Sequence, residues 1–230
     1  MVRASREVVR ALPLFSTVGA EFLGLLMRDV ALLEFERFAN VFKEGDPVFF
    51  LYTVVEGTVE LFRSRAGNEA TLHIVHLRET FFLPAVLRNQ TYRQSARTLT
   101  SARILRVPAA TIRELFDQDQ GFARAIAMDL AMGYNSAIKA LEDLKLCSSA
   151  ERLANWILEA HNAQGGTGQV TLKYPKRTLA SYLGMRPENL SRTLADLAEH
   201  GISIKGRVMV VEDPQAMQRW SRRESPVENS

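Results

Sequence analysis

The chain has 230 residues, of which 47% are hydrophobic, so it is long enough to bury one large core or two small ones. Its formal net charge of +3 is too small to indicate any class of partner. The single cysteine, Cys147, excludes an intrachain disulfide, a cysteine-held iron–sulfur cluster and a cysteine zinc site. No uncharged apolar run approaches the roughly 20 residues that span a bilayer, and the N-terminus lacks a signal-peptide core. We therefore expect a cytoplasmic protein that does not enter a membrane.

The first large segment has the pattern of an antiparallel β-domain. After a short N-terminal helical segment, residues 30–107 are rich in β-branched and aromatic side chains. Gly45, Gly57 and Gly67 interrupt these hydrophobic runs. Turn signals at this spacing favour an antiparallel sandwich or barrel over βαβ units. A further strand-forming run, "QSARTLTSARILRVP", ends the segment at Pro108.

A long helical region is predicted next. From about Thr111 to His161 almost no residue breaks a helix, and apolar side chains recur at alternating steps of three and four, the spacing of a coiled-coil seam. The seam consists of Ala127, Leu130, Tyr134, Ala137, Leu141 and Leu144. Because the seam is short, a single helix packed on its own domain is the alternative. The two alanines would let a partner helix approach closely, and we favour a parallel homodimer.

The C-terminal third has the outline of a winged helix-turn-helix. An amphipathic helix, "SSAERLANWILEAH", and a glycine-rich loop precede a short strand, "VTLKY". Two helices around Gly184 and a hairpin, "ISIKGRVMVVED", follow. In the helix pair, Ala180 is the small residue where the helices meet, and Leu190 and Leu194 face inward. The spacing by itself also fits other α-hairpins.

Basic residues gather in this C-terminal region. Between Thr171 and Met209 there are seven Lys or Arg residues against three Asp or Glu residues. Such a balance favours a polyanionic partner, although a basic face is more often only solvated surface. Nucleic acid is therefore a hypothesis that needs a recognition motif to support it.

Four stretches of the chain together resemble one known family. They are "LPLF" near the start, "FKEGDPVFFLYTVVEGTVEL" in the β-segment, the long helix, and "RTLASYLGMRPENLSRTLADLAEHGI". From about Leu12 to Val211 the chain is similar to the CRP/FNR family of bacterial transcription regulators. The resemblance implies an α+β fold whose sensor is a double-stranded β-helix, a jelly roll like the cyclic nucleotide-binding domain. The implied parts are the sensor with its N-terminal helix (1–118), a dimerisation helix (119–146), a winged helix-turn-helix DNA-binding domain (147–213) and a tail (214–230) whose end we expect to be disordered.

The resemblance places one helix of the winged domain in the major groove of DNA. It implies that Glu188, Ser191 and Arg192 read base edges there. An arginine can bond guanine O6 and N7 with two N–H groups, and a carboxylate can accept a hydrogen bond from cytosine N4. Residues 188 and 192 are neighbours on one helix face, so Glu188 can also orient Arg192. The alternative is a surface Glu–Arg pair that adds about 0.2–0.5 kcal/mol to helix stability.

The same resemblance extends to the DNA site and the partners. Glu and Ser before Arg resemble the FNR-like branch, which implies a palindromic site with TTGA-type half-sites. The family positions of phosphate contacts fall on Lys176, Arg177, Asn189 and the Gly206 amide. Such contacts position the protein on the duplex and make binding depend on salt. The implied partners are double-stranded DNA, a second copy of the chain and RNA polymerase.

The sensor half departs from the cAMP-binding members of the family. Those members hold the ligand with a Gly-Glu, an Arg-Ser and a Thr-Ser pair. The corresponding pairs here are Phe81-Phe82, Tyr92-Arg93 and Ala137-Ile138. A buried phosphate needs a cation, which Arg93 supplies only if the loop shifts by one residue, and the carboxylate is missing in either case. We therefore predict that cAMP is not the effector, and the single cysteine excludes the iron–sulfur cluster of the oxygen-sensing members.

Histidines and the segment "ETFFLPAVL" bear on metal and haem binding. His73 and His76 lie three residues apart on a predicted strand, so their side chains point to opposite faces and cannot chelate one metal. We expect no metal site, and the same geometry argues against a metal-dependent enzyme of the cupin type. The segment "ETFFLPAVL" would nevertheless line an apolar cavity suited to haem or another hydrophobic effector. The departure from the cAMP pattern and the "PENLSR" recognition helix resemble most the DNR-type nitric-oxide regulators of denitrification.

These observations leave the effector or cofactor unassigned. We expect its pocket to be formed by Phe81, Phe82, Leu83, Tyr92, Arg93 and Tyr134. The leading hypothesis is a homodimeric transcription regulator whose β-domain controls DNA binding through an effector. A haem-based NO or CO sensor, a regulator that needs no ligand and a cupin-like metalloenzyme are the alternatives. The chain has no clustered metal triad, nucleophile motif or phosphate-cradling glycine loop, so we predict that it is not an enzyme.

Overall fold

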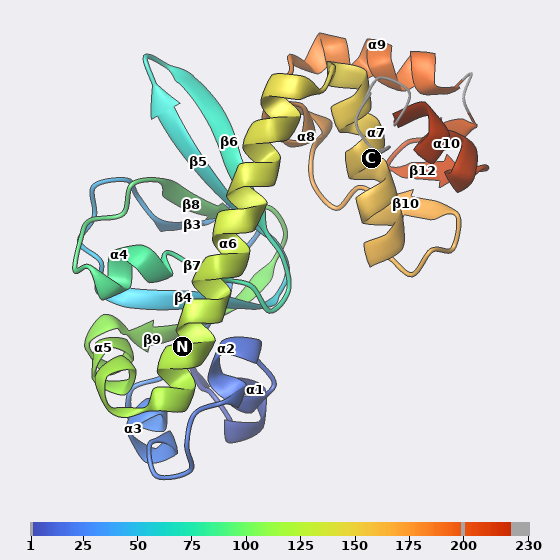
Figure 1. The fold of residues 1–230 in the computed structure, drawn as a ribbon. Helices are drawn as coiled ribbons and strands as arrows, with labels where there is room; N and C mark the ends of the chain where they lie inside the picture. Colours follow the sequence, from blue (N-terminus) through green and yellow to red (C-terminus); the bar gives the residue numbers. More distant parts are fainter. Residues whose placement is uncertain (1, 199–200, 222–230) are drawn as a thin grey trace. The chain divides into compact units, whose positions relative to one another are not determined.

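The computed structural model describes residues 2–198 and 201–221. The chain divides into two compact units, Met1–Ala137 and Ile138–Ser230, and the division falls within one long helix (Figure 1). Each unit has its own sheets and helices, so each is described by itself.

The first unit is built on two antiparallel sheets, as the turn spacing predicts. The five-stranded sheet has the order β1-β2-β9-β4-β7, and the four-stranded sheet has the order β3-β8-β5-β6. The strands are β1 (Val2–Arg3), β2 (Ala31–Phe35), β3 (Asn40–Phe42), β4 (Phe50–Glu56), β5 (Val59–Arg65), β6 (Asn68–Val75), β7 (Thr80–Phe81), β8 (Ser95–Thr98) and β9 (Ala102–Pro108). The helices are α1 (Arg6–Arg10), α2 (Pro13–Ser16), α3 (Leu23–Arg28), α4 (Leu83–Leu87) and α5 (Ala109–Gln118). All strand pairs described here are antiparallel, so the predicted β-domain is confirmed.

A glycine turn carries the chain from one sheet to the other. Gly57 follows β4 and has φ +89°, in the left-handed region that favours glycine. A Cβ at this position would lie 2.5 Å from the backbone oxygen of Ser101. The turn therefore packs directly on the backbone before β9, and only glycine fits there without displacing it.

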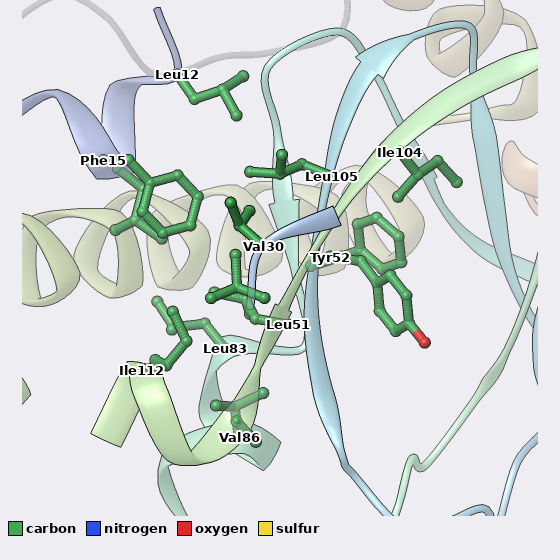
Figure 2. Close-up of a cluster of buried hydrophobic side chains, with 14 of the residues drawn as sticks. Leu12, Phe15, Val30, Leu51, Tyr52, Leu83, Val86, Ile104, Leu105 and Ile112 are labelled. Atoms are coloured by element: carbon green, nitrogen blue, oxygen red, sulfur yellow. The ribbon is translucent and has the colours of Figure 1, made fainter. Parts of the chain in front are cut away.

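One apolar core lies between the sheets and under the helices. Figure 2 shows part of it, where Phe15 of α2, Leu105 of β9 and Ile112 of α5 surround Leu51 of β4. All four side chains are fully buried. Burying a side chain of this size contributes about 1.5–3 kcal/mol relative to leaving it in water. The core therefore joins the N-terminal helices, the sheets and α5 into one body.

Helix α6 (Gln120–Leu146) starts on this body. The Asp119 carboxylate accepts hydrogen bonds from the backbone N–H of Gly19 at 2.8 Å and of Phe122 at 3.0 Å. Phe122 and Ile126 are buried in the core of the first unit, whereas residues 131–142 are exposed. The beginning of α6 is thus held by packing and by a cap, and the later turns are not covered.

A second cap separates α6 from the next helix. Helix α7 (Ser149–Ala163) begins with a capping box, in which the Ser148 hydroxyl accepts from the Glu151 N–H and the Glu151 carboxylate accepts from the Ser148 N–H. A capping box satisfies backbone donors that a helix start leaves unpaired. The helical region from residue 111 to residue 161 is therefore divided at Asp119 and at Ser148.

The second unit has the predicted arrangement of a winged helix-turn-helix. Helices α8 (Lys176–Tyr182) and α9 (Pro187–Ala198) follow α7, and the sheet has the order β10-β12-β11. The strands are β10 (Gln169–Thr171), β11 (Ile202–Lys205) and β12 (Val208–Val211). Residues 214–221, which we assigned to a tail, form helix α10 (Pro214–Ser221), which packs against α7 and buries Met217. The disorder predicted for the last residues falls, after Ser221, outside the described part of the chain.

Candidate nucleic-acid interface

A tight turn joins α8 to α9. Gly184 in this turn has φ +65°, and a Cβ there would lie 2.8 Å from the Cδ2 atom of Leu144. Arg152 of α7 donates from Nε to the Leu183 carbonyl at 2.9 Å and from Nη1 to the Cys147 carbonyl at 2.6 Å. Arg152 therefore ties the turn to α7 and fixes where α9 begins. The sequence indicates Gly184 but not Arg152, because an arginine on an amphipathic helix carries no sign of the carbonyls that it binds.

Helix α9 has a buried and an exposed side. The buried leucines are Leu190, Leu194 and Leu197. The predicted base-reading residues, Glu188, Ser191 and Arg192, are all exposed, and Ser191 and Arg192 follow Glu188 by three and four residues, which places both beside it on the helix surface. The Ser191 hydroxyl donates to the Pro187 carbonyl at 3.2 Å, within the same helix. The leucine spacing thus leaves these three polar side chains together at the surface.

The predicted orientation of Arg192 by Glu188 is not seen in the unbound chain. Among the described residues, the ion pairs are formed elsewhere, and none joins Glu188 to Arg192. Both charged groups are therefore open to solvent.

The four predicted phosphate contacts are exposed as well. Lys176 and Arg177 start α8, Asn189 lies in the first turn of α9, and Gly206 is at the tip of the β11–β12 hairpin. Helix α9 contacts both α8 and β11, so these segments border it. Further exposed cations of this unit are Arg186, Lys205 and Arg207. Positive charge around an exposed helix suits a phosphate backbone.

The predicted seam of α6 is largely uncovered. Tyr134 and Leu141 are 67% and 48% exposed, and Leu130 is partly buried against the core of the first unit. The remaining seam residues, Ala127, Ala137 and Leu144, are exposed. Uncovered apolar side chains outside the seam are Met128, Met132, Ile138 and Leu146. Contiguous exposed apolar surface commonly marks a contact with another molecule.

Of the helices in residues 2–198 and 201–221, none combines the length and the apolar character needed to cross a bilayer.

The predicted effector residues of the β-domain are packed against one another. Phe81, Phe82 and Tyr92 form a ring cluster with Phe42 and Tyr52. The centroids of Phe42 and Tyr92 are 3.8 Å apart and stacked, and Phe82 packs edge-on against both. The Tyr92 hydroxyl donates to a backbone carbonyl of β4 at 2.8 Å, and burial raises its pKa, so it stays protonated. The rings occupy the space in which we expected an apolar cavity.

The other predicted pocket residues are not gathered with these rings. Leu83 is buried in the core, while Arg93 and Tyr134 are exposed. Arg93 lines a separate cleft of about 860 Å³, and none of the other five predicted pocket residues lines it. The structure therefore does not bring the six residues together around one cavity.

The histidines have local partners. Strand β6 ends at Val75, so His76 lies in the following turn, and both His73 and His76 approach the Glu79 carboxylate. Burial opposes ionisation of Glu79, but the hydrogen bonds from the His73 side chain and the His76 N–H hold its pKa below the usual value. In unit two, the Nε2 atom of buried His161 accepts from the Gly168 N–H at 3.0 Å. No three His, Cys, Asp or Glu side chains in the described part of the chain are placed to hold a metal ion, and His200 lies outside that part.

Two family matches cover the two units. The cyclic nucleotide-binding domain matches residues 32–119, and the Crp-like helix-turn-helix domain matches residues 151–220. The chain belongs to the CRP/FNR family of transcription regulators. As a member of the CRP/FNR family it is a DNA-binding protein, with a cyclic nucleotide-binding-like domain before its helix-turn-helix.

Relatives extend over nearly the whole length. The CRP-like cAMP-activated global transcriptional regulator of Mycobacterium tuberculosis is 23% identical over 222 residues, which are 94% of this chain and 99% of the relative. The nitrogen fixation regulation protein FixK of Azorhizobium caulinodans is 26% identical over 199 residues, which are 80% of this chain and 77% of the relative. The structure of FixK2 from Bradyrhizobium japonicum matches with a TM-score of 0.77 at 19% identity, covering 87% of this chain and 99% of FixK2. The likeness to FixK2 supports the fold.

Proposed function

We propose that this CRP/FNR-family regulator binds DNA as a homodimer and reads a palindromic site with TTGA-type half-sites. The observation that carries the proposal is the exposed surface of α9, where Glu188, Ser191 and Arg192 lie away from the buried leucines. In a two-fold symmetric dimer, two such helices enter the major groove about one DNA turn apart, roughly 34 Å. The site is then a palindrome because the protein is symmetric.

Arg192 and Glu188 together suit a G·C base pair. The guanidinium of Arg192 can donate two hydrogen bonds to guanine O6 and N7, and the carboxylate of Glu188 can accept from cytosine N4. A TTGA half-site contains one such pair. Phosphates repel Glu188, so its presence in the first turn of α9 favours contact with bases over a loose contact with the backbone. Because no ion pair joins the two side chains in the described structure, both remain available to the bases.

The flanking cations position the helix without reading sequence. Lys176 and Arg177 at the start of α8, Asn189 and the Gly206 amide at the hairpin tip are exposed donors around α9. Contacts of this kind supply affinity that falls with rising salt and is similar for every sequence. RNA polymerase is the further partner that we infer from the family resemblance.

The α6 seam is the surface that we assign to the dimer. Its apolar residues, exposed in the single chain, would be covered by the same residues of a second copy in parallel orientation. Apolar area removed from water contributes about 25 cal/mol per Å². The small side chains of Ala127 and Ala137 let the two helices approach closely along the seam.

We infer that regulation does not use cAMP. The M. tuberculosis relative is named as cAMP-activated, but here Phe81 and Tyr92 lie buried in a ring cluster that contains no cation. A cyclic phosphate would have to displace these packed rings, and a buried anion costs several kcal/mol unless a cation pairs with it. Arg93 is the one cation among the three residue pairs that correspond to the cAMP-binding pairs, and it is exposed and borders a different cleft. The cluster also contains no histidine, so nothing observed favours the haem-based alternative.

A DNA titration tests the base-reading role. Fluorescence anisotropy with a duplex carrying two TTGA half-sites, and with a scrambled duplex, measures specific and nonspecific binding separately. Arg192→Ala should weaken specific binding by about 1–3 kcal/mol, roughly 5- to 150-fold, and leave nonspecific binding nearly unchanged. Lys176→Ala is the matched comparison, because loss of a phosphate contact should weaken both duplexes alike and lower the salt dependence.

Two outcomes would contradict the proposal. Equal losses of Arg192→Ala on both duplexes would place Arg192 on the backbone rather than on a base. If the wild-type protein binds both duplexes equally, the assignment of TTGA-type half-sites is wrong, whatever the variants do.

A further inference from the structure

The cleft that Arg93 borders has the dimensions of a ligand site. Its volume of about 860 Å³ lies within the range of roughly 300–1,000 Å³ that small-molecule sites occupy. Three segments of the first unit line it: residues 47–49 before β4, residues 89–91 and 93 after α4, and residues 108–110 and 113 at the start of α5. It is separate from the ring cluster, because none of the five rings lines it.

Backbone hydrogen bonds hold these three segments together. The Ala109 N–H donates to the Phe49 carbonyl at 2.8 Å, which joins the start of α5 to the segment before β4. Pro47 and Thr91 form an isolated β-bridge, which joins that segment to the loop after α4. The walls are therefore preformed, and a ligand would not have to order them.

The charges along the cleft have one sign. Arg93 and Arg113 line it, and no Asp or Glu is among its lining residues. Arg113 is held in place by the hydrogen bond from its Nη1 to the Val86 carbonyl at 2.9 Å. Arg93 is exposed, and it takes part in none of the ion pairs found among the described residues. Asn89, Gln90 and Thr91 add neutral hydrogen-bonding groups beside the two cations.

Other lining residues are apolar. Phe49 is 65% exposed although it is a large hydrophobic residue, and Pro47, Val48 and Pro108 line the cleft as well. An uncovered phenylalanine in a cleft whose charged lining residues are both arginines matches a ligand that has both an apolar body and a negative charge. We propose that the cleft binds a small organic anion, a carboxylate or a phosphate monoester with an aromatic or aliphatic body.

Arginine suits either anion. Its planar guanidinium donates parallel hydrogen bonds to a carboxylate or a phosphate, and charge-assisted bonds of this kind are stronger than neutral ones. The apolar body would cover Phe49 and the prolines, and so remove their surface from water. The binding step itself is independent of DNA recognition; a role as effector rests on the proposed function.

Fluorine NMR on the full chain tests the binding step with three probes. They are para-fluorobenzoate, para-fluorophenyl phosphate and the neutral para-fluorobenzyl alcohol. At least one of the two anions should bind, at least about tenfold more tightly than the alcohol, and the stronger of the two identifies the anionic group. Line broadening titrated against protein concentration gives the affinities.

Two matched variants locate the site. Arg93→Gln should weaken the bound anion about tenfold or more, because it removes a charge-assisted hydrogen bond. Arg65→Gln is the control, since Arg65 is also exposed, lies on β5 and is outside the cleft, and it should leave the affinity unchanged. Arg93 is exposed, so its replacement should not disturb folding, which the unchanged far-ultraviolet circular dichroism would verify.

The proposal is overturned if neither anion binds at concentrations up to about 10 mM, if the alcohol binds as well as the anions, or if both variants behave alike. These results are separate from failure of the proposed function. Arg192→Ala should lose specific DNA binding while keeping wild-type affinity for the probe, and Arg93→Gln should show the reverse. An effector role requires, in addition, that the bound probe changes the affinity for the TTGA duplex.

Discussion

Replacing Gly184 measures how the turn between α8 and α9 is held. We expect Gly184→Ala to lower the free energy of unfolding of the second unit by about 1–2 kcal/mol, because alanine adopts the left-handed region at that cost. The added Cβ would also lie 2.8 Å from Leu144 Cδ2. That atom ends an exposed side chain that can rotate away, so the contact should add little. Backbone conformation should therefore account for most of the loss.

Two further variants separate the cost of the backbone conformation at Gly184 from the cost of the close contact with Leu144. Gly184→Asn introduces a larger side chain, but asparagine tolerates the left-handed region, so it should cost less than alanine. Leu144→Ala removes the close contact, and in that background the cost of Gly184→Ala should change by less than about 0.5 kcal/mol.

Tryptophan fluorescence provides the assay. Both tryptophans of the chain, Trp156 and Trp220, belong to the second unit, so urea titrations followed by their emission report on this unit. The reasoning is refuted if Gly184→Asn destabilises more than Gly184→Ala, or if Leu144→Ala restores the lost stability. Either result would mean that space around the turn, rather than its backbone conformation, requires glycine.

Two other predictions concern α6. Asp119→Asn should lower the stability of the first unit by about 1–3 kcal/mol, because backbone donors that include the N–H groups of Gly19 and Phe122 lose a charged acceptor. Burial acts to raise the pKa of Asp119, but hydrogen bonds from the N–H groups of Gly19, Phe122 and Gly121 outweigh it and hold the pKa below the usual value. The carboxylate therefore stabilises the fold at a pH above the ordinary pKa of Asp, and this stabilisation is lost as the pH falls through the lower pKa that Asp119 has in the folded chain. Urea unfolding followed by circular dichroism should show this loss of stability in acid for the wild type but not for Asp119→Asn. Leu141→Lys should weaken the dimer at least about 100-fold in sedimentation equilibrium, because it places a charge in the seam. Met132→Lys, on an exposed residue outside the seam, should not, and equal effects would locate the dimer contact elsewhere.

Periodic patterns predicted the elements of this fold, but not the contacts between them. The glycine spacing indicated the antiparallel sheets, and the three-and-four spacing indicated the long helix. The cap at the start of α6 has no such signature, because one of its donors, the Gly19 N–H, lies 100 residues before Asp119 in the chain. Helix α10 was missed for a related reason: its stability depends on burying Met217 in the second unit, which no local pattern records.

In the candidate functional sites, too, local patterns predicted some features and missed those that depend on contacts between distant segments. The exposed side of α9 could be predicted because the leucine spacing alone decides which residues face solvent. The effector region could not, since aromatic residues in one segment indicate an apolar environment but not whether it is hollow. Phe42 and Tyr52, from two other strands, supply the rings that fill it. The cleft of Arg93 is likewise assembled from three separate segments.

Helix α6 restricts how any effector of the first unit could act on α9. Phe122 and Ile126 anchor its start, while near its end Lys139 pairs with Glu159 of α7 and Leu144 lies beside Gly184. Its 27 residues extend over about 40 Å at 1.5 Å per residue, and the boundary between the two units falls within them. A ligand shifts the chain between two conformations only if it binds them with unequal affinity. To invert a 1:99 population, the two affinities must differ by about 10,000-fold. The cleft lies at the start of α5, whereas Asp119 joins the other end of α5 to α6, so a ligand there would act on α6 through α5 without first displacing packed rings.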